Sequence, residues 1–178
     1  MIEILWHGRG GQGAFTAAKL LGAAFSLKSD NSYSIAFPSF GPERRGAPIR
    51  AFTKLDTKPI GNRSEIGKAD YILFLDDTLF TESALDDLKD GGKIILNSKR
   101  IPSSERIIAI DGDQIAKDIL RMPITNTIML GALTAVTDAL DIAQVEQAIE
   151  GYMPKKLHEK NKAAARAAME AAEQEAAR

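Results

Sequence analysis

A glycine-rich loop near the start of the chain carries residues whose spacing could support chemistry. Gly8, Gly10 and Gly13 follow the pattern G-x-G-x-x-G, between an apolar run at residues 2–6 and an amphipathic run that begins at Ala14. Glycine tolerates positive φ and lets another backbone or a phosphate approach closely, and a helix that starts after such a loop presents free amide groups to an anion. The pattern therefore predicts a strand, a turn and a helix arranged around an anion or a close neighbour.

A dinucleotide is the first ligand to weigh for this loop, and one requirement for it is missing. Dinucleotide-binding folds place a carboxylate about 20 residues further on, where it binds the ribose. Asp30 falls before the second predicted strand, and residues 36–39 carry no carboxylate. Arg9 and Gln12, inside the loop, instead favour outward polar contacts to a partner or an anion. The alternative is that the glycines only permit a tight turn and close packing of the helix on the strand.

A second loop combines restricted backbone angles with paired positive charges. Residues 41–48 read Gly-Pro-Glu-Arg-Arg-Gly-Ala-Pro, and prolines limit such a segment to few shapes. Arg44 and Arg45 offer planar forks that suit carboxylate or phosphate groups. Both loops follow predicted strands, and ligands of open α/β sheets bind beyond the carboxyl ends of the strands, so we expect the two loops to line one crevice. An ion-pair network through Glu43 that stiffens a subunit interface is an equal and compatible alternative.

The other side chains with catalytic potential fit structural roles better. Asp76 and Asp77 follow the apolar segment 71–75; they could act as an acid–base pair or bind magnesium, but capping of the next helix is the favoured interpretation. We expect His7 to be structural, because no acid–base partner is identifiable, and His158 to be solvated. The sequence therefore assigns no catalytic residue and no metal ligand to this chain.

Composition narrows the possible functions further. The 178 residues have a formal net charge of -1, contain no cysteine and are 44% hydrophobic. The balanced charge argues against a general nucleic-acid-binding surface, and the lack of thiols excludes disulfides and an iron–sulfur cluster ligated by this chain. No apolar run reaches the roughly 18 residues of a membrane span, and the first residues do not read as a signal peptide. We therefore expect a cytoplasmic protein with a substantial core.

The order of the predicted elements indicates the fold class. Strands and helices alternate up to Asp111, with short glycine turns between them, which is typical of a mostly parallel sheet covered by helices on both faces. Beyond that point helical periodicity dominates. We therefore predict an α/β, Rossmann-like fold with a helical C-terminal portion. The predicted strands span 2–6, 33–37, 49–55, 71–75, 93–96 and 106–110, and the predicted helices span 15–27, 79–88, 114–120, 127–140 and 142–153.

The helical portion contains one strongly apolar segment and one that is poor in large apolar groups. Residues 126–133 should be buried, with Gly131 allowing another element to approach closely. Residues 162–178 are rich in alanine and in charge, so their helix propensity is high but their apolar stripe is thin. We therefore predict a Rossmann-like domain at 1–161 and a helical tail at 162–178, which either projects onto a partner or is partly frayed.

Three motifs occur in a fixed order along the chain. The first is Trp-His-Gly-Arg-Gly-Gly-Gln-Gly-Ala at 6–14, followed by Ala-Phe-Pro at 36–38; the second spans 40–48; the third is Asn-Thr-Ile-Met-Leu-Gly-Ala at 126–132. Together they closely resemble the gamma subunit of the 2-oxoacid:ferredoxin oxidoreductases, over residues 1–161. The wording Glu-Arg-Arg-Gly-Ala-Pro is similar to that of the pyruvate and branched-chain 2-oxoacid types, which favours pyruvate as the substrate.

The resemblance implies an activity that belongs to a complex and not to this chain alone. In that family the enzyme decarboxylates a 2-oxoacid on thiamine diphosphate, transfers the acyl group to coenzyme A and sends two electrons through 4Fe–4S clusters to ferredoxin. Thiamine diphosphate, Mg and the clusters are then bound by the alpha, beta and delta subunits, and the isolated gamma chain binds no cofactor. The resemblance implies that this chain scaffolds the thiamine diphosphate and coenzyme A site, through cofactor or subunit contacts of Gly8, Arg9, Gly10, Gly11, Gln12, Gly13, Glu43, Arg44 and Arg45.

Two other functions stay open on the sequence alone. The first is a free-standing oxidoreductase that binds NAD, NADP or FAD through the glycine loop. The second is a module that binds coenzyme A or another phosphorylated metabolite through Arg44 and Arg45. Binding of these ligands to the isolated chain distinguishes both functions from that of a subunit of a larger enzyme.

Overall fold

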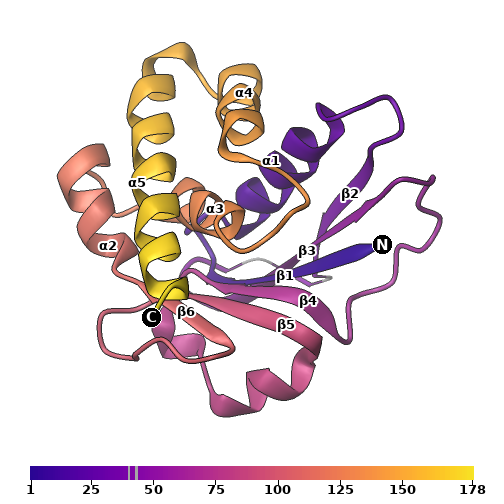
Figure 1. Cartoon of the computed structure of the whole chain (residues 1–178). Coiled ribbons are helices and arrows are strands. Elements are labelled where there is room, and N and C mark those ends of the chain that lie inside the picture. The colour runs from indigo at the N-terminus through magenta and orange to yellow at the C-terminus, as the bar shows by residue number, and fades with distance from the viewer. Residues whose placement is uncertain (40, 43) are drawn as a thin grey trace.

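A mixed β-sheet forms the centre of the fold. The computed structural model describes residues 1–39, 41–42 and 44–178, and in that part of the chain six strands lie in the order β2-β3-β1-β4-β5-β6 (Figure 1). β1, β4, β5 and β6 are parallel to one another, whereas β3 is antiparallel to both β1 and β2. The α/β class predicted from the sequence is confirmed. The strands are β1 (Ile2–Arg9), β2 (Tyr33–Pro38), β3 (Pro48–Asp56), β4 (Ala69–Phe74), β5 (Leu88–Asn97) and β6 (Ile107–Ile110).

The α-helices gather on one side of this sheet (Figure 1), and their alanine and leucine side chains belong to the core cluster that packs on the strands. Trp6, fully buried on that face, donates its indole N–H to Thr53 Oγ1 at 3.1 Å, and Thr53 Oγ1 donates to the carbonyl of Ala18 at 3.0 Å. This pair of hydrogen bonds ties the first helix to two strands. The helices are α1 (Ala14–Ser26), α2 (Gly112–Ile115), α3 (Asn126–Thr134), α4 (Ile142–Tyr152) and α5 (His158–Ala176); a π-helical turn, η3 (Ala116–Leu120), extends α2, and a 3-10 turn, η4 (Lys155–Leu157), precedes α5.

Short 3-10 helices and loops cover the opposite face. η1 (Asp77–Leu79) and η2 (Glu82–Asp87) lie below the sheet in Figure 1, in place of the single helix predicted over 79–88. Phe80, between them, has extended backbone angles, and its ring meets Phe74 of β4 edge-on at 5.5 Å. Packing of this ring on the sheet interrupts the helix that the local periodicity indicates.

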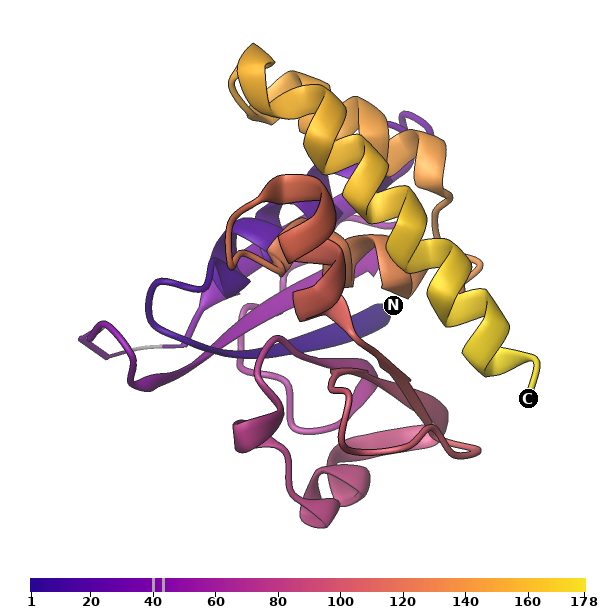
Figure 2. The same cartoon turned by 90° about the vertical axis from the view of Figure 1, so that its left-hand side faces the viewer.

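Helix α5 lies across the other helices and packs on α3 (Figure 2). A Cβ atom added to Gly131 in α3 would lie 2.1 Å from the carbonyl oxygen of Ala165 in α5, so the close approach predicted at Gly131 is confirmed. The alanine stripe of α5, which consists of Ala164, Ala165, Ala168 and Ala172, is fully buried, and the interpretation of residues 162–178 as a projecting or frayed tail is wrong. The boundary predicted after residue 161 falls inside one continuous helix. None of the helices that the structure describes is long and apolar enough to cross a membrane.

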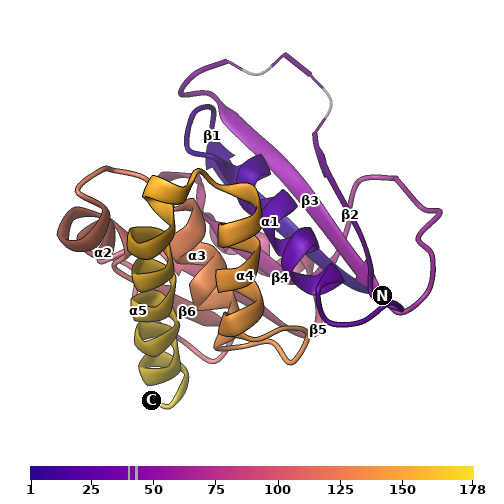
Figure 3. The ribbon, with the colours of Figure 1, turned by 90° about the horizontal axis from the view of Figure 1, so that it is seen from above.

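β2 and β3 form an antiparallel hairpin at one edge of the sheet, and the second loop connects them (Figure 3). β2 runs in the same direction as β1, so the loops that follow these two strands lie at the same end of the sheet, as the sequence predicts. β3 pairs with β1 in the opposite direction, with Pro48 beside Arg9. In a dinucleotide-binding fold, a parallel strand next to β1 ends in the carboxylate that binds the ribose. Here β3, on one side of β1, is antiparallel and begins at this end of the sheet, so it cannot supply that carboxylate. On the other side of β1, the parallel strand β4 is followed by Asp76, which binds Arg9 and Gln12 within the chain.

Candidate functional site

The first two sequence motifs are bonded to each other at the end of the sheet where β1 stops. The amide of Gly10 donates to the carbonyl of Ala47 at 2.9 Å, and its carbonyl accepts from the amide of Gly46 at 3.0 Å. A Cβ atom at Gly10 would lie 2.2 Å from the carbonyl oxygen of Arg44. The close backbone approach that the glycine spacing predicts is therefore made at Gly10 by the chain's own second loop, which weakens the dinucleotide alternative.

Gly13 brings the third motif to the same place. Its φ of +81° lies in the left-handed region, which other residues rarely adopt. A Cβ atom there would lie 2.6 Å from Nδ2 of Asn126, the first residue of α3, and this nitrogen donates to the carbonyl of Gly13 at 3.4 Å. Gly8 is buried within β1. Gly10 and Gly13 therefore let parts of this chain approach one another closely, and Gly8 is packed inside β1.

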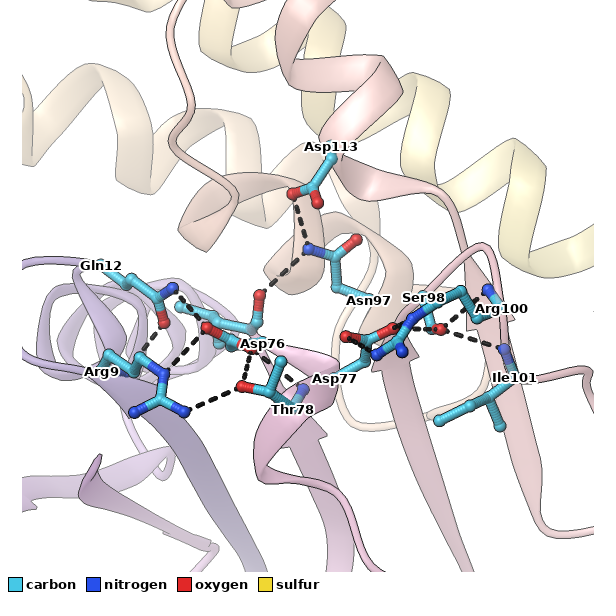
Figure 4. Close-up of polar contacts among 11 residues, drawn as sticks. Arg9, Gln12, Asp76, Asp77, Thr78, Asn97, Ser98, Arg100, Ile101 and Asp113 are labelled. Atoms are coloured by element: carbon cyan, nitrogen blue, oxygen red, sulfur yellow. Dashed lines mark hydrogen bonds and ion pairs between the residues drawn. The ribbon is translucent and has the colours of Figure 1, made fainter. Parts of the chain in front are cut away.

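Arg9 and Gln12 point inward and bind the carboxylate that follows β4 (Figure 4). Asp76 Oδ2 accepts hydrogen bonds from Arg9 Nε at 3.2 Å and from Gln12 Nε2 at 3.1 Å. Gln12 Oε1 accepts from the amide of Arg9 at 2.7 Å, which closes the turn of the glycine loop. Both side chains thus bind an acceptor within the chain, 67 and 64 residues away in the sequence, and their contacts to a partner or an anion stay a prediction.

The same guanidinium reaches the second loop. Arg9 Nη1 donates to the carbonyl of Gly46 at 3.0 Å, and Arg9 Nη2 donates to Thr78 Oγ1 at 2.9 Å. Asp76 also caps η1, because it accepts from the amide of Thr78 at 3.0 Å, and the predicted cap is confirmed. Burial tends to raise the pKa of Asp76, but hydrogen bonds from Thr78 and Gln12 and the charge of Arg9 outweigh it and hold this pKa below its usual value. Asp76 is therefore ionised at neutral pH.

Asp77 turns away from the glycine loop. Its carboxylate accepts from Arg100 Nη2 at 2.7 Å and from Ser98 Oγ at 2.6 Å. The hydrogen bond from Arg100 is the main reason why the pKa of Asp77 lies below its usual value. The two neighbouring carboxylates thus have separate partners and form no acid–base pair. The sequence predicts Asp76 as a cap but does not predict its hydrogen bonds from Arg9 and Gln12. The signal for them was the position of Asp76 directly after β4, a strand that pairs with β1.

The exposed surface at this end of the sheet includes Gly11 and the paired arginines. Gly11 has a φ of +93°, and a Cβ atom there would lie 3.8 Å from Cγ of Arg45. Arg44 and Arg45 are exposed, and they take no part in the ion pairs found within residues 1–39, 41–42 and 44–178. Glu43 lies outside the described residues, so the Arg–Glu network stays a prediction. The edge therefore presents two guanidinium groups beside a glycine that an approaching molecule could contact.

The two histidines have structural surroundings. His7 stacks on Phe74 with the ring centroids 4.4 Å apart and pairs with Arg50 of β3. Burial, and then the charge of Arg50, lowers the pKa of His7 to about 4. His7 is therefore neutral at pH 7 and supplies a flat ring to the packed face of the sheet. His158, predicted to be solvated, donates from Nε2 to the carbonyl of Met153 at 2.7 Å.

The donor chemistry of this chain suits an anion better than a metal or a cluster. Within the part of the chain that the structure describes, no three histidine, aspartate or glutamate side chains converge to hold a metal ion. The sequence contains no cysteine for a cluster. The exposed guanidinium groups of Arg44 and Arg45 suit phosphate or carboxylate groups. This end of the sheet can therefore bind and position an anionic group. The carboxylate of Asp76 is not free for that purpose, because it is hydrogen-bonded to Arg9 and Gln12.

One family model and several known proteins match nearly the whole chain. Residues 3–171 match the family model described as pyruvate ferredoxin/flavodoxin oxidoreductase. The chain is 45% identical to the pyruvate synthase subunit PorC of Methanothermobacter marburgensis, over 96% of this chain and 97% of that protein. It is 42% identical to the pyruvate/ketoisovalerate oxidoreductases common subunit gamma of Thermococcus litoralis, over 96% of both chains.

Solved structures share the fold. The pyruvate oxidoreductase subunit PORC of Thermotoga maritima superposes with a TM-score of 0.79 at 32% identity, over 95% of both chains. The 2-oxoglutarate:ferredoxin oxidoreductase of Magnetococcus marinus shares the fold alone, with a TM-score of 0.73 at 18% identity over 99% of this chain and 31% of that longer chain. From the family match and the relatives above 40% identity, we conclude that the chain belongs to the pyruvate ferredoxin/flavodoxin oxidoreductase family, among its gamma subunits.

Proposed function

We propose that this chain forms one wall of the site at which partner subunits of a 2-oxoacid:ferredoxin oxidoreductase hold thiamine diphosphate and coenzyme A. The observation that carries the proposal is the convergence of the three motifs on one end of the sheet, where Arg44 and Arg45 are exposed. Because the two loops are hydrogen-bonded to each other, the surface that they form keeps a fixed shape. Gly11, exposed at the turn of the glycine loop, has no side chain and lets another molecule come close. Such a surface suits contact with a large, negatively charged co-substrate.

The chemistry itself belongs to groups that the partners would supply. Alpha, beta and delta subunits would bind thiamine diphosphate, Mg and the 4Fe–4S clusters, and the complex would pass electrons to ferredoxin. This division agrees with the donor set of this chain, which lacks cysteine. Arg44 and Arg45 would pair with phosphate groups of coenzyme A, and the apolar side chains around the second loop would exclude water from that contact.

The small volume of the pocket next to the second loop supports a site that two subunits form together. A pocket of about 210 Å³ opens beneath the second loop, between Phe15 of α1, Pro42 and Arg50. Pockets that enclose a whole ligand usually measure about 300–1,000 Å³. A pocket of this size accommodates only part of a coenzyme, so a second subunit would have to complete the site.

Pyruvate is the substrate that we favour, with branched-chain 2-oxoacids next. The amino-acid sequence of the second motif supports this order. The names of the relatives also support it, since one is a pyruvate synthase subunit and the other is a common subunit of pyruvate and ketoisovalerate oxidoreductases. Assays of the purified complex with pyruvate, branched-chain 2-oxoacids and 2-oxoglutarate test the choice. The highest kcat/KM is expected for pyruvate, and a preference for 2-oxoglutarate would contradict it.

The decisive experiment removes the guanidinium groups from the assembled enzyme. Each charge-assisted hydrogen bond contributes about 1.5–3 kcal/mol, so Arg44→Ala and Arg45→Ala should each raise the KM for coenzyme A about tenfold or more. Arg178→Ala removes an exposed arginine that pairs with Glu175, three residues earlier, and this control should leave the KM unchanged. An unchanged KM in both loop variants would contradict the contact with coenzyme A. Loss of partner subunits from either variant would assign the loop to the subunit interface instead.

Calorimetry on the isolated chain tests the free-standing alternatives. NAD, NADP and FAD should give no heat of binding, because both backbone polar groups of Gly10 are already bonded within the chain. Saturable binding of a dinucleotide would overturn the subunit proposal. Saturable binding of coenzyme A to the lone chain, abolished by Arg44→Ala, would favour a self-sufficient binding module.

A further inference from the structure

One guanidinium joins three segments of the chain at the candidate site. Arg9 stands at the end of β1, and its Nε donates to Asp76 at 3.2 Å, its Nη1 to the carbonyl of Gly46 at 3.0 Å and its Nη2 to Thr78 at 2.9 Å (Figure 4). The three donors lie in one rigid plane. A rotation that releases one of these bonds therefore disturbs the other two.

The acceptor at the centre of this arrangement is anchored more firmly than the loops that it holds. Asp76 follows β4, which pairs in parallel with β1, and its second oxygen accepts from the amide and the hydroxyl of Thr78. Its side chain is 19% exposed and that of Arg9 is 33% exposed. The pair is therefore screened less by solvent and salt than an ion pair on the open surface.

The second loop depends on this guanidinium for its placement. Gly46 directly follows Arg44 and Arg45, and its carbonyl is the acceptor for Arg9 Nη1. Without the carboxylate at Asp76, the Arg9 side chain would lose its anchor and release Gly46. Among the described residues, the backbone bonds at Gly10 would then hold this loop to the glycine loop, and its tip could rotate about them.

We propose that Asp76 is a positioning residue that, through Arg9, fixes the exposed Arg44–Arg45 pair relative to the glycine loop. The part that concerns coenzyme A rests on the proposed function, whereas the fixing of the loop does not. Asp76 touches no reacting group in this scheme. It acts on the second loop through Arg9, whereas its hydrogen bond from Gln12 holds the glycine loop, and its effect is on the position of the two arginines.

Two substitutions of Asp76 separate the effect of its negative charge on Arg9 from the effect of its cap on η1. Asp76→Asn keeps a good helix cap but removes the negative charge that holds Arg9. Asp76→Glu keeps the charge but replaces a favoured cap with a longer side chain. Asp77→Asn is the matched control, because Asp77 bonds with Arg100 and Ser98 and contacts neither loop.

Limited trypsin digestion of the full chain reads out the position of the loop, because trypsin cuts after Arg44 and Arg45. Cleavage there should be about fivefold faster in Asp76→Asn, since cleavage of a native chain follows local opening. Asp76→Glu and Asp77→Asn should be cut at close to the original rate, and the thermal midpoint should be similar in all variants. Equal cleavage of Asp76→Asn and the unaltered chain would overturn the inference. Faster cleavage of Asp76→Glu than of Asp76→Asn would also overturn it, since capping and not charge would then hold the loop.

Kinetics of the assembled complex test the inference and the proposed function separately. Asp76→Asn should raise the KM for coenzyme A several-fold and leave kcat unchanged, because the chemistry lies in other subunits. If cleavage becomes faster while the KM stays the same, the positioning role stands and the contact with coenzyme A fails. If cleavage is unaltered, the positioning role fails whatever the KM.

Discussion

Replacing Gly131 by alanine should destabilise the protein, although alanine is the better helix former. A Cβ atom at Gly131 would lie 2.1 Å from the carbonyl oxygen and 2.6 Å from the carbonyl carbon of Ala165. Carbon–oxygen contacts are ordinarily about 3.3 Å or longer, so α5 would have to move away from α3 by about 1 Å. The obstacle is the backbone of a helix, and therefore no side-chain rotation can relieve the contact.

The magnitude follows from the alanines that this movement would loosen. The stripe of α5 is fully buried, and each buried methyl-sized group contributes about 0.8 kcal/mol, so loosening all of them would cost about 3 kcal/mol. The better helix propensity of alanine offsets about 1 kcal/mol of this loss. The expected net effect is about 2 kcal/mol, as is usual for overpacked cores. The stripe consists of Ala164, Ala165, Ala168 and Ala172, each 0% exposed.

Chemical and thermal unfolding of the full chain measure this effect. A loss of about 2 kcal/mol lowers the Tm of a chain of this size by about 4–8 °C. Gly151→Ala is the matched control, because Gly151 lies in the last turn of α4 and nothing stands within 4 Å of an added Cβ. That variant should be stabilised by up to about 1 kcal/mol. If Gly131→Ala were stabilised to the same extent, the close packing of α5 on α3 would be refuted.

Three further predictions concern the end of the sheet and the buried histidine. Gly10→Ala would place a Cβ atom 2.2 Å from the carbonyl oxygen of Arg44, so the second loop should detach and trypsin should cut after Arg44 about tenfold faster; an unchanged rate would show that the loops do not touch. Gly11→Val forces a β-branched residue to a φ of +93°, so the assembled enzyme should lose activity while circular dichroism of the free chain stays native; an active complex would mean that the loop is less constrained. The pKa of His7 is lowered to about 4, chiefly by burial. Between pH 6.5 and 4 the unfolded chain therefore binds more protons than the folded chain, and stability should fall as the pH drops, by on the order of 2–3 kcal/mol in total. His7→Phe, which keeps a ring against Phe74, should flatten this fall in urea titrations at several pH values, and an undiminished slope would assign it to other groups.

Features that depend on neighbours in the sequence could be predicted. The strand, turn and helix around the glycine loop follow from local spacing, and so does the burial of α3, because side chains repeat every two residues in strands and every 3.6 in helices. The cap at Asp76 was predictable for the same reason, since a cap acts on the amide two or three residues later. The shared end of the two loops followed from the order of the strands.

Features that depend on distant partners could not be predicted. Arg9 finds its acceptor 67 residues away, and nothing in the glycine loop indicates that its side chain turns inward. The alternation in β3 predicts a strand but not its direction, which the hairpin with β2 decides. Alanine side chains alone indicate a weakly packed helix. In the structure α5 packs closely on α3, because Gly131 has no side chain and the backbone of α5 can approach it. In each case the deciding atom belongs to another element of the fold.

The burial of α3 has a consequence for the synthesis of the chain. Residues 126–133 of this apolar helix are buried in the folded protein, and α5 covers the side that faces away from the sheet. A ribosome adds about 5–20 residues per second, so α3 emerges a few seconds before α5 is complete. During that interval the nascent chain displays an uncovered apolar helix, which is a binding site for chaperones and a starting point for aggregation. Packing of α5 on α3 therefore completes the core only after the last residues of the chain have been synthesised.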